Sequence, residues 1–66
     1  MKNTVKVERA IMDITQQQLA EAVGVSRNTI IYIESGRYVP STVLALKIAR
    51  YFRKPLEVIF QLEEGE

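Results

Sequence analysis

The sequence predicts an all-α fold of five short helices. Three kinds of signal support this class: Thr or Ser residues that favour a helix N-terminus stand at positions 15, 26 and 41, glycines that can end a helix stand at positions 24 and 36, and apolar residues recur at helical spacing between them. Because no segment is long, we expect the helices to cross steeply around one core. The chain shows no repeat or linker, so residues 1–66 are expected to form one domain.

The first helix is predicted over residues 5–12, because Val5, Arg9 and Met12 fall on one helical face. Asn3 or Thr4 can cap its N-terminus. The alternation in residues 5–7 would also suit a strand, but the spacing over the whole segment favours a helix.

Residues 15–35 predict two helices joined by a tight turn. Thr15 and Gln18 form a capping box, which begins the first of these helices, and Gly24 can adopt the left-handed conformation that ends it. Ser26 is the N-cap of the second, which stops before Gly36. Two short helices with a turn of about three residues are typical of a helix-turn-helix.

Two more helices follow. Ser41 can cap a helix that carries apolar residues through to Arg53, and Pro55 restarts a short helix over residues 56–60. The tails, residues 1–4 and 61–64, can pair as a short antiparallel ribbon, as the alternation of Phe60 and Leu62 hints.

Composition argues against an enzyme. The chain has neither Cys nor His, and Asp13 is its only Asp, so thiolate zinc sites, the commonest metal ligand and the commonest general base are missing. We therefore expect no cofactor and no metal. The apolar runs are short and the N-terminus lacks a signal sequence, so we expect a cytoplasmic protein without a membrane anchor.

The second helix of the helix-turn-helix has a distinctive outward face. Ile30 and Ile33 would seat it on the core, which leaves Ser26, Arg27, Asn28, Ile31 and Tyr32 outside. Arg can make two hydrogen bonds to guanine and Asn two to adenine in the major groove of DNA. This pattern favours DNA contact over a solvated surface more strongly for Arg27 than for Asn28, and Tyr32 suits a half-buried or interface position equally well.

The sequence resembles the lambda-repressor-like, XRE-type helix-turn-helix regulators, and among them the compact single-domain repressors similar to the cytolysin-operon repressor. The resemblance spans nearly the whole chain and rests on a set of motifs: Ile14-Thr15-Gln16, Leu19-Ala20, Val23-Gly24-Val25-Ser26-Arg27, Thr29-Ile30, Ile33-Glu34, Gly36, Pro40-Ser41 and Leu46-Lys47-Ile48-Ala49. It implies a sequence-specific transcriptional regulator, a repressor rather than an activator, that binds a pseudo-palindromic operator in double-stranded DNA as a homodimer.

The resemblance also implies roles for individual residues. The base edges would be contacted by Arg27, Asn28, Tyr32 and Ser26, the last of which could bond a phosphate instead. The sugar-phosphate backbone would be contacted by Gln16, Ser35, Arg37 and Tyr38. Arg9 and Glu34 would form a partly buried structural pair. Ile31 and Tyr32 are bulkier than the polar residues common at such positions, which suggests contact with a thymine methyl group or with a protein.

The C-terminal region leaves two questions open. Leu56, Ile59, Phe60 and Leu62 are either core residues or the dimer interface, which the resemblance implies within residues 55–64. A chain this short can bury only a small core, which favours assembly. The alternative to a DNA-binding function is a protein-interaction module, such as an antitoxin or adaptor with the same fold.

Charge is distributed unevenly. The net charge is only +1, which is low for a protein that binds phosphates. Residues 26–54, however, carry six basic residues and one acidic residue, whereas residues 55–66 carry four glutamates and no base. The predicted DNA-binding segment is therefore basic despite the near-neutral total.

Overall fold

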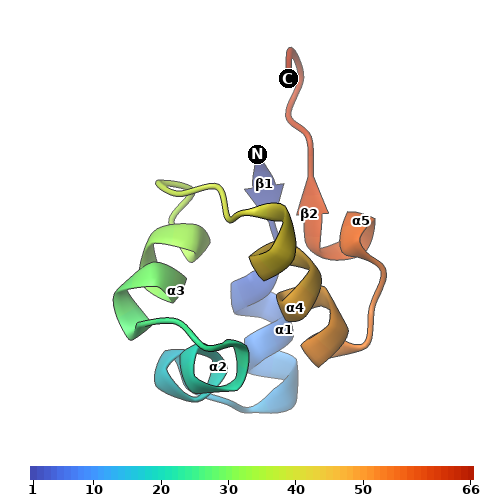
Figure 1. The fold of residues 1–66 in the computed structure, drawn as a ribbon. Coiled ribbons are helices and arrows are strands. Elements are labelled where there is room, and N and C mark those ends of the chain that lie inside the picture. Colours follow the sequence, from blue (N-terminus) through green and yellow to red (C-terminus); the bar gives the residue numbers. More distant parts are fainter.

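Five helices and a two-stranded antiparallel sheet make up the computed structural model, which describes all 66 residues. The elements are β1 (Lys2–Asn3), α1 (Val5–Met12), α2 (Gln16–Val23), α3 (Arg27–Glu34), α4 (Thr42–Phe52), α5 (Leu56–Ile59) and β2 (Phe60–Gln61). In Figure 1, α4 crosses the middle of the domain, α3 lies on the left and α2 at the bottom. The predicted mostly helical class with a terminal ribbon is confirmed.

Helix starts are set by local caps at the predicted residues. The Thr15 hydroxyl accepts from the Gln18 amide at 3.0 Å, and the Gln18 side chain accepts from the Thr15 amide at 2.8 Å. Ser26 and Ser41 cap α3 and α4 with one bond each, in which the hydroxyl accepts from the amide of Thr29 or Leu44. At α1 the capping side chain is Asn3, which accepts from the Val5 amide at 3.2 Å. Each such cap contributes about 1 kcal/mol, which adds to the stability that these short helices gain from packing.

Two helices, α1 and α4, end at a left-handed residue that is not a glycine. Gly24 ends α2 as predicted, with φ of 78°. Asp13 and Arg53, however, end α1 and α4 in the same left-handed conformation, with φ of 55° and 58°. Their backbone amides bond back to carbonyls of the last turn, at 3.1 Å in both cases, which offsets the strain.

The core lies where α2, α3 and α4 meet and extends to α5. Its fully buried members include Leu19, Ile30, Ile33, Ile48 and Ile59. The predicted inward face of α1 is only partly correct: Val5 is buried, but Met12 is 44% exposed and Glu8 is buried instead. Glu8 is stabilised there by Lys54, whose Nζ lies 2.8 Å from a carboxylate oxygen.

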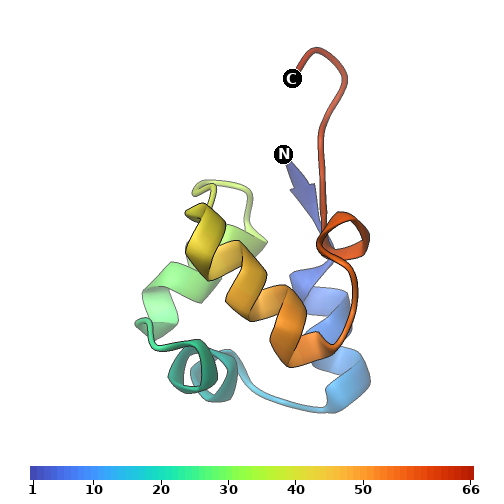
Figure 2. The same cartoon turned by 45° about the vertical axis from the view of Figure 1, so that its right-hand side comes forward.

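The two ends of the chain lie side by side (Figures 1 and 2). Asn3 pairs with Phe60 and Lys2 with Gln61, so the second strand begins one residue earlier than the predicted tail pairing. The last residues project from the domain, where the backbone amide of Glu63 and the Met1 ammonium lower the pKa of the Glu66 carboxyl. None of the helices has the length and apolar character needed to cross a lipid bilayer.

Candidate nucleic-acid interface

The pair α2 and α3 forms a helix-turn-helix at residues 15–35. Gly24, Val25 and Ser26 make the turn, and the Val25 amide donates to the Ala20 carbonyl at 3.0 Å. Ala20 is fully buried where the two helices pack against each other, so its small side chain permits the close approach. The inner face of α3 packs on the core through Ile30 and Ile33, which are fully buried.

The outer face of α3 presents the predicted base-contacting residues. Arg27 and Asn28 are exposed in the first turn of the helix, and Tyr32 is 46% exposed one turn later. Ile31 is half-buried beside them. Ser26 is also exposed, but its hydroxyl already accepts from the Thr29 amide and lies 3.0 Å from the Thr29 hydroxyl.

The loop after α3 folds back onto the end of that helix. The Tyr32 carbonyl accepts from the backbone amides of Arg37 and Tyr38, at 2.9 and 3.2 Å, and from the Ser35 hydroxyl at 3.0 Å. All three loop residues are exposed. The predicted backbone-contacting residues of this loop are therefore held beside Tyr32.

Arg9 and Glu34 form the predicted ion pair between α1 and α3. The Arg9 Nε donates to Glu34 Oε2 at 2.8 Å and Nη2 donates to Oε1 at 3.2 Å, with the side chains 16% and 6% exposed. A third partner was not predicted: the Gln16 side chain donates to Glu34 Oε1 at 3.1 Å. Sequence spacing could not reveal this bond, because it joins two different helices.

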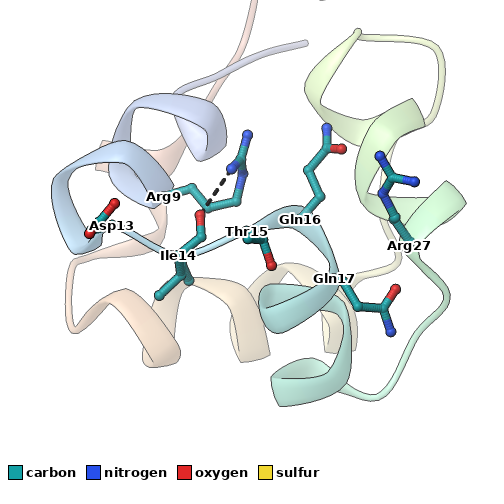
Figure 3. Close-up of a pocket in the computed structure, with 7 residues that line it drawn as sticks. All are labelled: Arg9, Asp13, Ile14, Thr15, Gln16, Gln17 and Arg27. Atoms are coloured by element: carbon teal, nitrogen blue, oxygen red, sulfur yellow. Dashed lines mark hydrogen bonds between the residues drawn. The ribbon is translucent and has the colours of Figure 1, made fainter.

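An open recess of about 740 Å³ lies where α1, α2 and α3 meet. Figure 3 shows its lining residues, which are Arg9, Asp13, Ile14, Thr15, Gln16, Gln17 and Arg27. Gln16 and Arg27 thus border the same opening although they belong to different helices. The N-terminus of α2 also lies there, and free amides at a helix N-terminus together with an arginine suit a phosphate group.

Comparison with known proteins identifies the family. The family model described as helix-turn-helix matches residues 5–59, which include all five helices. The chain belongs to this helix-turn-helix family, of the XRE type. It is similar to an uncharacterized HTH-type transcriptional regulator of Methanocaldococcus jannaschii, with 52% identity over 66 residues that cover both chains completely. A regulator of the same description from Bacillus subtilis is 52% identical over 64 residues, 97% of each chain.

A third relative is a phage protein. The ImmF control region 10 kDa protein of Bacillus phage phi105 is 36% identical over 59 residues, which are 89% of this chain and 66% of the phage protein. Family membership makes this helix-turn-helix protein a DNA-binding transcriptional regulator. It also confirms the prediction of a non-enzymatic protein, because the family consists of regulators.

The structure shows how far each candidate residue of the dimer interface is exposed in a single chain. Ile59 is completely buried and Phe60 is 7% exposed, so both are enclosed by their own chain and have almost no surface to offer a partner. Leu56 is half-buried against the core, and Leu62 is 71% exposed. Val58, which the sequence reasoning did not select, is 43% exposed on the same short helix as Leu56.

Proposed function

We propose that this helix-turn-helix regulator is a repressor that binds a pseudo-palindromic operator as a homodimer. The observation that carries the proposal is the outer face of α3, where Arg27 and Asn28 are exposed at the helix end that a major groove can admit. The phage relative, which is named for a control region, supports a regulatory role. As a repressor, the protein would act on DNA in the cytoplasm and would resemble the compact single-domain repressors similar to the cytolysin-operon repressor.

Each exposed residue has a proposed part. Arg27, Asn28 and Tyr32 would contact base edges, with Ser26 at a base or a phosphate. Gln16 would hold the phosphate beside the N-terminus of α2, and Ser35, Arg37 and Tyr38 would follow the sugar-phosphate backbone beyond α3. The apolar surface around Leu62 would join two protomers so that two copies of α3 enter successive major grooves, about 34 Å apart.

A binding-site selection on random duplexes tests this function. We expect an enriched motif made of two inverted half-sites whose centres lie about one helical turn, or 10 base pairs, apart. A reconstituted transcription reaction with that motif placed over a promoter should then yield less transcript as protein is added. Enrichment of a single asymmetric half-site would contradict the dimer, and increased transcript would contradict repression.

One observation favours a second function. Tyr32 and Ile31 give the outer face of α3 an aromatic and an aliphatic side chain, which also suit contact with a partner protein. An adaptor or antitoxin of this fold would bind no duplex at low salt. The absence of any enriched sequence in the selection, together with no gel shift at low salt, would therefore favour the protein-interaction module.

A further inference from the structure

The carboxylate of Glu34 serves two side chains from two other helices. Its Oε2 accepts from Arg9 Nε at 2.8 Å, and its Oε1 accepts both from Arg9 Nη2 at 3.2 Å and from Gln16 Nε2 at 3.1 Å. The remaining Arg9 contact, from Nη1 to the Ile14 carbonyl at 3.0 Å, ties the same cluster to the turn between α1 and α2 (Figure 3). Side chains from three helices therefore meet at one carboxylate, and Arg9 links them to the turn.

This arrangement holds the Gln16 side chain in one place. A glutamine on a surface normally samples many rotamers, and fixing it on binding costs conformational entropy. Here the amide is already fixed at the edge of the recess that Arg27 also borders. A side chain that is ordered before binding loses less freedom when a ligand arrives, so its contact adds more affinity.

The neighbouring residue provides an internal comparison. Gln17 is the same residue type, lines the same recess and also lies in the first turn of α2. It is exposed and makes no hydrogen bond with Glu34. The structure thus contains one ordered and one free glutamine at the same helix N-terminus.

The charge of Glu34 would be unfavourable near DNA if it stood alone. A carboxylate repels phosphates, but the Arg9 guanidinium neutralises it through two hydrogen bonds. Arg9 therefore allows an acceptor for Gln16 to lie close to the expected DNA backbone without a net negative charge.

We propose that Glu34 is a positioning residue, which orders the Gln16 amide for contact with a DNA phosphate while Arg9 cancels its charge. This inference rests on the proposed DNA contact of Gln16 and adds a role for Glu34 beyond the structural pair. Glu34 itself touches no DNA in this proposal. Its effect on binding passes through Gln16 alone.

Two substitutions that remove the same charge test the proposal. Glu34→Gln (E34Q) keeps a side-chain oxygen that can accept from Gln16, whereas Glu34→Ala (E34A) keeps none. Both remove the negative charge that pairs with Arg9, and they differ in a side-chain oxygen that can accept from Gln16 or from Arg9. The part of the difference that belongs to the Gln16 bond is isolated by repeating the comparison in a Gln16→Ala background. We expect E34A to bind a mixed-sequence duplex about 2- to 10-fold more weakly than E34Q, the range that one net hydrogen bond provides.

The glutamine backgrounds supply the matched control. In Gln16→Ala protein the difference between E34Q and E34A should disappear, and in Gln17→Ala protein it should persist. Binding is measured by fluorescence anisotropy at low salt and corrected for the folded fraction from circular dichroism. If E34A does not fold, Glu34→Met replaces it, because that side chain keeps the length and lacks the oxygen.

The outcomes separate this inference from the proposed function. If wild-type protein binds no duplex, the proposed function and the inference both fail. If wild-type protein binds but E34Q and E34A do not differ, or differ equally in the Gln16→Ala background, the positioning role is wrong while DNA binding stands. If the affinity difference between E34Q and E34A disappears in Gln16→Ala protein and persists in Gln17→Ala protein, the inference is supported. A general loss of stability would affect both backgrounds alike.

Discussion

Substitution of Arg27 tests most directly whether the protein recognises the base sequence of its operator. Its side chain is exposed in the first turn of α3, and no carboxylate forms an ion pair with it. We expect Arg27→Ala to weaken binding to the selected operator by about 1–3 kcal/mol and to relax specificity at one base pair, as the loss of a bidentate guanine contact would. Anisotropy titrations on the operator and on its single-base variants measure both effects.

Arg37 and Arg50 provide the contrast for this prediction. Arg37→Ala should weaken binding to all sequences alike and lower the slope of affinity against salt by about one unit, because it would remove a phosphate contact. Arg50 is exposed on α4 outside the helix-turn-helix, so Arg50→Ala should leave specificity unchanged and should lower the salt slope less than Arg37→Ala does. If Arg27→Ala loses the same affinity for operator and scrambled DNA, Arg27 is not a reader of bases.

Single residues were predicted best where the signal is local or where the family supplies it. The outward position of Arg27 follows from the burial of Ile30 and Ile33 on the opposite side of one helix. The bonds from Gln16 to Glu34 and from Lys54 to Glu8 were not predicted. Both depend on how separate helices approach each other, and in the sequence Glu8 looks like an ordinary surface charge.

At the scale of elements, the turn between α2 and α3 depends on Gly24. Its φ of 78° lies in the left-handed region, and a Cβ there would meet no atom within 4 Å. Gly24→Ala should therefore destabilise the fold through backbone strain alone, by about 1–2 kcal/mol. Urea unfolding followed by circular dichroism measures this change.

Two further substitutions separate strain from other causes. Gly24→Asn should lose less stability than Gly24→Ala, because Asn tolerates the left-handed conformation better. Gly65 also has a positive φ, of 90°, but lies in the projecting tail, so Gly65→Ala should leave the unfolding midpoint unchanged. Equal losses for Gly24→Ala and Gly24→Asn would contradict an explanation by strain.

Helix starts were predictable because an N-terminal cap depends on residues only a few positions apart, as Thr15 and Gln18 show. Helix ends at Asp13 and Arg53 carry no glycine, so the sequence offered a weaker signal there. The strand at residues 60–61 was misplaced by one residue, because its start depends on pairing with Lys2 and Asn3 at the other end of the chain. Local chemistry thus fixes the helix boundaries, whereas the strand boundary depends on a partner distant in the sequence.

For the whole molecule, the spacing of apolar residues near the C-terminus could not show which of them belong to the core and which to a dimer interface. Leu56, Ile59, Phe60 and Leu62 are all apolar, and only packing shows that Ile59 and Phe60 complete the core. The apolar side chains left exposed in this region are Leu62 and Val58, while Leu56 is half-buried against the core. Residues 55–66 also carry four glutamates and no base, so the negative charge of this end of the chain is separate in sequence from the basic segment 26–54.

The dimer prediction therefore concerns Leu62. Burying a leucine side chain contributes about 1.5–3 kcal/mol, so Leu62→Asp should raise the dimer dissociation constant by at least about tenfold. Sedimentation equilibrium measures the dimer dissociation constant. Affinity for the selected palindrome should fall as the dimer weakens, because two linked copies of α3 bind more tightly than one. Ile11→Asp is the matched control, since Ile11 is 68% exposed on α1 compared with 71% for Leu62. An unchanged dimer in Leu62→Asp, or an equal loss in Ile11→Asp, would place the interface elsewhere on the molecule.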